Sequence, residues 1–330
     1  MTASTGHRLR AVLAGAVDAV PAPDVVFAAL HEGHREVVTG GTAPPPGCDR
    51  RELRFEIGSA GKTFTALLLA QLDARGELRC ADPVVRHLPA AAHRPATRRL
   101  TLRHLATHTA GLPRLPPSLY LHAARHGSTN AYAGYSTERV LTAFARTRPR
   151  NVGTWRYSNL GYAVLGHALA HAQGTAFDDL LTARVLTPLR LTDTDTHPSP
   201  PGRLPRSGTV PQLRMDGFAP AGAVRSTADD LLTYLAAHLD PAGSALADSL
   251  HTVRAPVPHP APGESRSLGW FIHHDDRGAL YFHAGATFGH TTFLGFRPAT
   301  ATAVVALAGR RAHRRFPLVP TAYRLLADIR

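Results

Sequence analysis

The sequence predicts an α+β fold, an α/β sandwich in which an antiparallel sheet flanked by helices is built from both ends of the chain. Two observations support this prediction. Strand patterns occur near both ends of the chain, as apolar, β-branched runs in residues 24–31 and 35–39 and as a period of two between residues 268 and 307, whereas residues 81–215 show mainly helical patterns. We therefore expect a sheet-containing lobe made of residues 1–80 and 216–330, an inserted helical lobe made of residues 81–215, and an active-site cleft between them.

The first segment predicts an amphipathic helix. Arg8 and Arg10 precede a short apolar run that faintly resembles a secretory signal, but Asp18 interrupts this run. Apolar residues recur there at helical spacing, at Leu9, Val12, Leu13, Val17 and Val20. We interpret the segment as the first helix of the mature protein and expect a cytoplasmic location.

The next elements lead to a serine at the junction of a strand and a helix. Residues 24–31 and 35–39 predict a β-hairpin, because two apolar, β-branched runs flank a short turn that contains glycine. Residues 53–57 predict a short strand. A helix is predicted over residues 63–75, where the following glycine is the residue type that most often ends a helix. Ser59 lies between these two elements.

The middle of the chain predicts helices that are separated by breaks rich in Pro and Gly. These helices are predicted over residues 101–112, 137–146, 160–173 and 177–186. Residues 113–136 are rich in Pro, Tyr, Gly and Asn, which predicts a long loop with at most a short helix, of the kind that forms a pocket wall or lid. Residues 192–214 contain five prolines and predict a linker.

The last third of the chain returns to strands. Ser226 and Thr227 precede alanine and aspartate in a sequence typical of a helix cap, and the helix is predicted to run through residue 238. Four strands joined by short turns and one final helix follow, over residues 268–274, 280–283, 290–296, 301–307 and 317–329.

Lys62 is the only lysine in the chain, because all the other basic residues among the 37 Lys and Arg are Arg. A guanidinium keeps its proton in proteins, whereas a desolvated ammonium can lose it, so this exception indicates a need for a neutral amine. Ser59 lies three residues earlier, which places its hydroxyl within reach of the amine on a helical turn. The positive potential of a helix N-terminus also favours an alkoxide. We therefore predict Ser59 as a nucleophile and Lys62 as its base.

Two further motifs are weak signals when each is considered alone. Tyr157-Ser158-Asn159 begins a predicted helix, where a Tyr hydroxyl can relay a proton and an Asn amide can hydrogen-bond an acyl-amide substrate. His283-Ala284-Gly285 ends a predicted strand, where the glycine would let a substrate approach the backbone. The N–H groups of Ala286 and Ser59 would then form an oxyanion hole. The common alternatives for these motifs are helix capping, packing and a satisfied strand histidine.

The composition argues against several other classes of protein. The net charge of +13 would suit nucleic acid or anionic lipid, but the arginines are scattered, so we expect no nucleic-acid partner. The two cysteines lack zinc-ligand spacing and the twenty histidines contain no H-E-x-x-H motif, so we expect no metal and no cofactor. No run of 18 apolar residues occurs, so we expect no membrane span. The sequence gives no indication of oligomeric state.

Taken together and in this order, the S-x-x-K, Y-x-N and H-x-G motifs resemble those of the serine β-lactamase and penicillin-binding-protein superfamily. The resemblance is strongest to the class C-type branch, which contains β-lactamases, D,D-carboxypeptidases, D-aminopeptidases, esterases and transacylases. It covers nearly the whole chain, because residues 101–112, 188–194 and 221–232 also resemble segments of the family. The resemblance implies a β-lactamase/transpeptidase-like fold.

The resemblance also implies a role for each motif residue. Ser59 would be acylated, Lys62 would be its general base, and Tyr157 would relay a proton to the leaving group and then receive one from the acceptor. Asn159 would hold the substrate side chain. The backbone N–H groups of Ser59 and Ala286 would hold the oxyanion.

One motif departs from the family pattern. In class C β-lactamases and carboxypeptidases the third motif begins with Lys, as K-T-G, whereas here it begins with His283. A neutral His supplies no permanent charge for a substrate carboxylate, which disfavours β-lactam and peptidoglycan substrates unless a nearby Arg replaces the charge. We still expect His283 and Gly285 to contact the substrate.

These observations define the expected function and its alternatives. The leading expectation is an esterase or amidase that forms an acyl-enzyme on Ser59 from a small-molecule acyl donor. The alternative is an intracellular transacylase that moves the acyl group to an amine acceptor in natural-product, for example antibiotic, biosynthesis. A catalytically silent binding protein is the non-enzymatic alternative.

Overall fold

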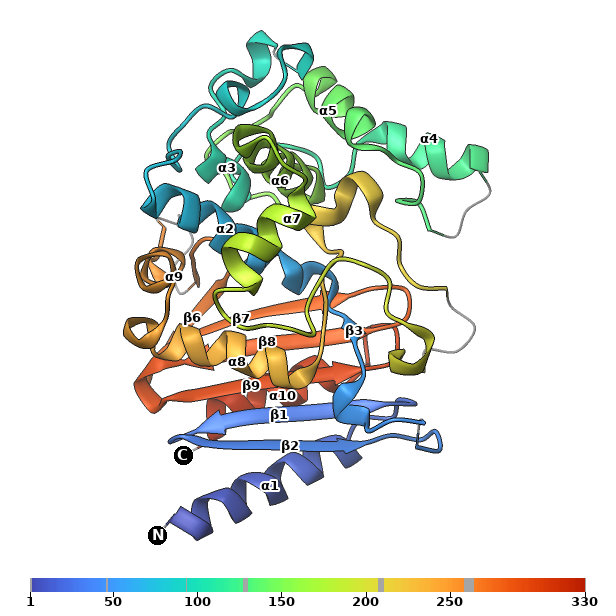
Figure 1. Cartoon of the computed structure of the whole chain (residues 1–330), viewed down its shortest axis with the longest axis vertical. Helices are drawn as coiled ribbons and strands as arrows, with labels where there is room; N and C mark the ends of the chain where they lie inside the picture. Colours follow the sequence, from blue (N-terminus) through green and yellow to red (C-terminus); the bar gives the residue numbers. More distant parts are fainter. Residues whose placement is uncertain are drawn as a thin grey trace.

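The computed structural model describes residues 2–45, 47–92, 94–126, 130–206, 211–257 and 264–329. At its centre is a seven-stranded antiparallel sheet with the strand order β2-β1-β9-β8-β7-β6-β5, shown in Figure 1. The strands are β1 (Val25–His31), β2 (His34–Gly40), β5 (Glu264–Arg266), β6 (Phe271–Asp275), β7 (Gly278–Ala286), β8 (Thr291–Arg297) and β9 (Thr302–Ala308).

The two ends of the chain meet inside this sheet. β1 pairs with β9 along its whole length, with Val25 opposite Ala308 and His31 opposite Thr302. Every residue of β8 and β9 is buried, which is the pattern expected of strands that are covered on both faces. The predicted sheet built from both termini, and the predicted hairpin of β1 and β2, are therefore confirmed.

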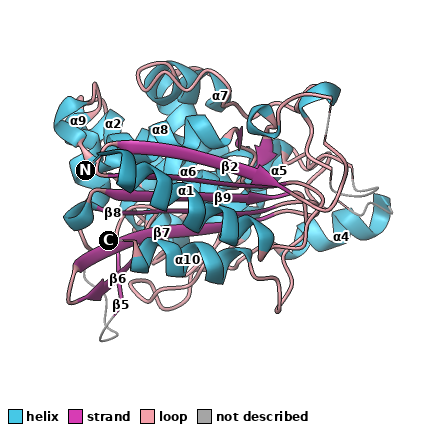
Figure 2. Cartoon of the chain, turned by 90° about the horizontal axis from the view of Figure 1, so that it is seen from below, coloured by secondary structure: helices cyan, strands magenta, loops and turns pink. Residues whose placement is uncertain are grey.

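Helices cover both faces of the sheet. Figure 2 shows α1 (Thr2–Asp18) and α10 (Leu318–Asp328) lying across one face. The other face packs on α8 (Ala228–Leu239) and on the core that contains α2 (Lys62–Ala74) and α9 (Ala247–Arg254). Because successive side chains of a strand point to opposite faces, Val25, Phe27 and Ala29 pack with the terminal helices, whereas Val26 and Ala28 belong to the larger core.

A group of helices lies beyond α2 at the end of the molecule remote from α1 (Figure 1). It contains α3 (Leu102–Ala106), α4 (Pro117–His126), α5 (Thr137–Arg146), α6 (Asn159–Gln173) and α7 (Phe177–Leu181), which continues as a π-helical turn over Thr182–Leu186. The predicted stop of α6 is confirmed, since Gly174 adopts a left-handed conformation with φ of 63°. Among the described residues, no helix is long and apolar enough to cross a bilayer.

One prediction in the helical region is wrong. The helix predicted over residues 101–112 ends at Ala106, because His108 takes a φ of 59° and the following backbone pairs with residues 150–156 instead. The segment 113–136, predicted as a loop with at most a short helix, contains the ten-residue helix α4, in which Leu119 and His122 are buried; residues 127–129 of that segment lie outside the described part of the chain.

The predicted linker over residues 192–214 packs closely on the strand that precedes Ser59. That strand, β3 (Phe55–Glu56), is shorter than predicted and pairs with β4 (Arg225–Ser226) in a separate two-stranded sheet. The backbone N–H of Leu213 donates to Glu56 Oε1 at 2.6 Å, and Asp195 forms a backbone bridge with β4. Residues 207–210 lie outside the described residues. The elements β4, β5 and α9 are absent from the sequence-based prediction.

We predict that the terminal-helix layer contributes strongly to stability. Phe293 of β8 is fully buried in the cluster formed with α1 and α10, so Phe293→Ala is expected to lower the free energy of unfolding by about 3–5 kcal/mol. Val12→Ala on the exposed side of α1 is the control and should change it by less than about 0.5 kcal/mol. Urea unfolding followed by circular dichroism measures both. Equal, small losses would contradict the described core.

Candidate active site

Three side chains from separate segments meet at one serine hydroxyl. Ser59 lies in a 3₁₀ turn, Gly58–Gly61, that runs directly into α2, and Lys62 is the first residue of that helix. Lys62 Nζ lies 3.1 Å from Ser59 Oγ, and the Tyr157 hydroxyl donates a hydrogen bond to the same oxygen at 2.7 Å. The structure thus brings together the three residues that the sequence predicts as catalytic.

The Lys62 amine is fully buried, whereas Ser59 is partly exposed. Nζ donates to the backbone carbonyl of Ala221 at 2.6 Å, and no ion pair to an acidic group is found for it among the described residues. Burial, assisted by the positive charge of Arg114, holds the pKa of Lys62 well below its usual value of 10.5. A buried amine without an anionic partner favours the neutral form, which is the form a general base needs.

Tyr157 shows the opposite shift. Burial raises the pKa of its phenol to about 12, although the hydrogen bond to Ser59 and the charge of Arg114 oppose this effect. Its ring packs against His108, with 4.5 Å between ring centroids, and the Lys62 amine lies 5.0 Å from the ring centroid. The phenol therefore keeps its proton at neutral pH, so a neutral amine and a protonated hydroxyl flank the Ser59 oxygen.

The end of β7 presses on the turn that carries Ser59. A Cβ on Gly285 would lie 1.8 Å from the carbonyl oxygen of Ile57, and a Cβ on Gly58, whose φ is +53°, would lie 2.9 Å from the nitrogen of Ala286. Glycine at position 285 therefore makes room for the Ile57 carbonyl, and its contact with substrate stays a prediction. The backbone of Ala286 lies beside the turn, next to the position of the oxyanion hole predicted with the Ser59 N–H.

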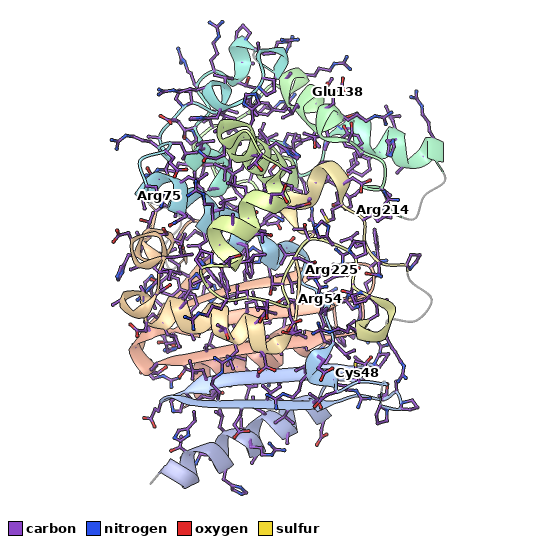
Figure 3. The ribbon with its side chains drawn as sticks, in the orientation of Figure 1. Cys48, Arg54, Arg75, Glu138, Arg214 and Arg225 are labelled. Carbon is purple, nitrogen blue, oxygen red and sulfur yellow. The ribbon has the colours of Figure 1, made fainter. Side chains whose placement is uncertain are left out.

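A buried polar network fixes the strand that leads to Ser59. Glu56 Oε2 lies 3.3 Å from His290 Nδ1, and Glu56 Oε1 lies 3.6 Å from the Arg225 guanidinium. Burial would raise the pKa of Glu56, but hydrogen bonding and the charge of His290 lower it overall. Figure 3 shows Arg225 close to Arg54 near β3. These contacts fix β3, the strand that leads to Ser59.

Asn159 begins α6 and lies beside an aromatic wall. Its Nδ2 donates to the Tyr132 hydroxyl at 3.3 Å, and its backbone N–H donates to the carbonyl of Arg114 at 3.0 Å. The Tyr132 ring packs against Phe218, with 5.2 Å between ring centroids. Asn159 Oδ1 is buried and accepts no hydrogen bond from any described residue, so it is available to an N–H donor.

His283 is buried and neutral. Burial is the main cause that lowers its pKa to about 3, and its Nδ1 lies 2.8 Å from the carbonyl of Ala284. His283 and Arg266 line the same small hollow, in which the Arg266 guanidinium lies 4.1 Å from the Trp155 ring centroid. The third motif therefore supplies no positive charge itself, and Arg266 is a nearby arginine of the kind the sequence left open.

The sequence did not single out four participants in this site. They are the Ala221 carbonyl, the His108 ring, the Tyr132 hydroxyl and the Arg114 guanidinium. Ala221 acts through its backbone, which carries no residue-type signal. Arg114 and Tyr132 lie in segment 113–136, which was predicted as a pocket wall or lid. The Arg and the several Tyr among its prolines could have identified them as candidate site residues.

A Ser–Lys pair beside the end of an antiparallel strand, with a Tyr hydroxyl on the same oxygen, is the arrangement that the sequence motifs predict for the β-lactamase fold. A family model described as Beta-lactamase matches residues 9–328, so the chain belongs to the beta-lactamase family. The members of this family that resemble the chain include β-lactamases and carboxypeptidases.

Three curated relatives illustrate the similarity. The D-alanyl-D-alanine-carboxypeptidase/endopeptidase AmpH of Escherichia coli (strain K12) is 28% identical over 56% of this chain and 48% of its own length. A Beta-lactamase of the same strain is 29% identical over 57% of this chain and 48% of its own length. Penicillin-binding protein 4 of Amycolatopsis lactamdurans is 31% identical over 56% and 51%, respectively. The matched region spans about half the length of each relative.

We predict that acylation of Ser59 depends on the neutral form of Lys62. As the pH falls through the lowered pKa of Lys62, the amine is protonated and the acylation rate should fall; above that pKa the rate should be level through pH 10. Lys62→Met keeps similar volume without the amine and should lower the rate by a factor of about 10²–10⁴.

The burst of p-nitrophenol from p-nitrophenyl acetate between pH 5 and 10 measures this dependence. A rate that keeps rising toward pH 10, as it would with an exposed lysine, contradicts the proposed base. Less than tenfold loss in Lys62→Met contradicts it as well.

Proposed function

We propose that this protein is a serine hydrolase that forms an acyl-enzyme on Ser59 with a small ester or amide. The observation that carries the proposal is the pair of contacts on Ser59 Oγ, made by the buried Lys62 amine at 3.1 Å and by the Tyr157 hydroxyl at 2.7 Å. The opposite pKa shifts of these two groups support Lys62 as the base and Tyr157 as the proton donor.

The reaction follows from this arrangement. Lys62 takes the hydroxyl proton as Ser59 Oγ bonds to the substrate carbonyl carbon, and the N–H groups of Ser59 and Ala286 receive the oxyanion. The bond to the leaving group then breaks as the proton held by Lys62 passes through Tyr157 to the departing oxygen or nitrogen. In the second half of the reaction, water gives a proton through Tyr157 to Lys62 as its oxygen bonds to the acyl carbon. The bond between that carbon and Ser59 Oγ then breaks, Lys62 returns the proton to Oγ, and the acid is released.

The third motif favours a substrate without a carboxylate at that position unless the neighbouring Arg266 binds the carboxylate. His283 is neutral because its pKa is about 3, so it offers hydrogen bonding without charge. The free Asn159 Oδ1 suits an amide or hydroxyl donor on the acyl group, and Tyr132 gives an aromatic surface beside it. Because relatives are named as a carboxypeptidase and a β-lactamase, peptides and β-lactams are the competing class of substrate. Hydrolysis of nitrocefin, a β-lactam, tests the second of these directly.

The second candidate is transfer of the acyl group to an amine. The observation that favours it is the same unpaired, buried Asn159 Oδ1, because an acceptor N–H there would be held near the acyl-enzyme. In this form the protein would be a cytoplasmic amide synthase that uses an ester as the acyl donor.

We predict that Ser59 is labelled covalently by a fluorophosphonate probe. The intact protein should gain the mass of one phosphonyl group, whereas Ser59→Ala should gain none. Tyr157→Phe should label more slowly, by a factor of about 10–10³, because the proton relay is lost. Intact-protein mass spectrometry measures this. Absence of labelling in a folded wild-type protein would support the silent binding alternative, for which Ser59→Ala leaves the biological role unchanged.

We predict that the acyl acceptor can be identified by product partition. Wild-type protein is incubated with an ester donor and a panel of primary amines, and free acid is compared with amide by chromatography. A hydrolase gives acid at a rate that is independent of amine. A transacylase gives amide in proportion to amine concentration, with Ser59→Ala as the control for uncatalysed aminolysis.

A further inference from the structure

A second cavity lies in the helical lobe, separate from the Ser–Lys–Tyr cluster. It has a volume of about 900 Å³ and is formed by α4, α5, the segment 146–156 and residues around Pro113 and Pro116. Figure 1 places α4 and α5 at the end of the molecule remote from α1. A cavity of this size is typical of a site for a small organic ligand.

Arginine dominates the charged lining of this cavity. Six exposed arginines line it, namely Arg125, Arg139, Arg146, Arg148, Arg150 and Arg156. The one carboxylate in the lining is Glu138 of α5, which is labelled in Figure 3. Within the described part of the chain, none of the six forms an ion pair, and Arg139 donates instead to His122 Nδ1 at 2.7 Å.

The cavity also lies in the most basic part of the chain. Residues 83–177 contain twelve arginines and a single acidic residue, Glu138. The net charge of this segment is therefore +11, compared with +13 for the whole chain. A cavity lined by charges of one sign concentrates its field and attracts counter-ions. Arginine is the residue best suited to hold phosphate and carboxylate groups, because its planar fork donates two parallel hydrogen bonds.

The wall of the cavity is shared with the candidate active site. The Pro113 carbonyl accepts a hydrogen bond from Ser158 Oγ at 2.7 Å, and the carbonyl of Arg114 accepts from the backbone N–H of Asn159 at 3.0 Å. Arg156 of the lining directly precedes Tyr157. The same short segment therefore forms one side of the cavity and supports the residues at the start of α6.

We propose that this arginine cavity binds a small polyanion that bears phosphate or carboxylate groups. Six guanidinium groups around one cavity match several anionic groups on a single molecule better than one isolated ion. The polyanion would be the part of the acyl donor or acceptor that lies away from the reacting carbonyl. This role rests on the proposed function, but the binding of the polyanion to the cavity does not rest on it.

The test uses isothermal titration calorimetry with inorganic pyrophosphate and with citrate, which separate phosphate from carboxylate recognition. Saturable binding of at least one of them is expected for the full-length wild type and equally for Ser59→Ala. Arg146→Gln/Arg148→Gln should weaken that binding by at least about tenfold, because two charge-assisted contacts are lost. The matched control is Arg98→Gln/Arg99→Gln, which removes equal charge from exposed positions of the same lobe outside the cavity, and it should stay within about twofold.

Three results would overturn the proposal. The first is that neither anion binds saturably. The second is that the control variant loses as much anion affinity as the double variant. The third is that an acidic protein binds although neither small anion does. Circular dichroism of each variant verifies folding, and if the double variant unfolds, Arg125→Gln alone is used, with an expected loss of about threefold or more. Anion binding without labelling of Ser59 would contradict only the proposed function, and labelling without anion binding would contradict only this site.

Discussion

The burial of one amine is the constraint on which the rest of the site depends. Lys62 reaches no carboxylate in the described structure and instead donates to the Ala221 carbonyl while it touches Ser59. Close backbone packing produces this burial. A Cβ on Gly61 would lie 3.2 Å from Val224, and one on Gly222 would lie 3.0 Å from the carbonyl oxygen of Gly58. These glycines let the surrounding segments close around the amine and exclude water, which lowers its pKa.

The fold serves this cluster by joining segments that are far apart in the chain. The sheet, assembled from both termini, sets β7 against the turn that carries Ser59, and the polar network around Glu56 fixes the incoming strand. The segment that leads into α6 supplies the Tyr157 hydroxyl, 98 residues along the chain from Ser59. Neither the sheet nor this segment alone brings Lys62, Ser59 and Tyr157 together.

The sequence predicted the parts of this protein that residue type determines. Lys62 stood out because it is the only lysine, and the strands stood out as apolar, β-branched runs near the start of the chain and as a period of two after residue 268. Features that depend on tertiary contacts were missed or misjudged. The helix that begins at Leu102 is cut short by a left-handed residue that pairs with a distant segment. The position of helix α4 was not predicted because prolines precede and begin it, although proline is well tolerated in a first helical turn. Five of the six arginines of the second cavity already lie within residues 139–156, and the fold adds Arg125 from α4.

The central claim can be measured directly because Lys62 is the only lysine in the chain. Growth with ¹³C/¹⁵N-labelled lysine gives a single side-chain signal in the NMR spectrum, whose ¹³Cε shift reports the protonation state of the amine as the pH is varied. The structure predicts a titration midpoint well below 10.5, with the amine neutral under the conditions in which Ser59 reacts. A midpoint at or above the usual lysine value would show a charged amine beside Ser59 and would contradict its role as the base.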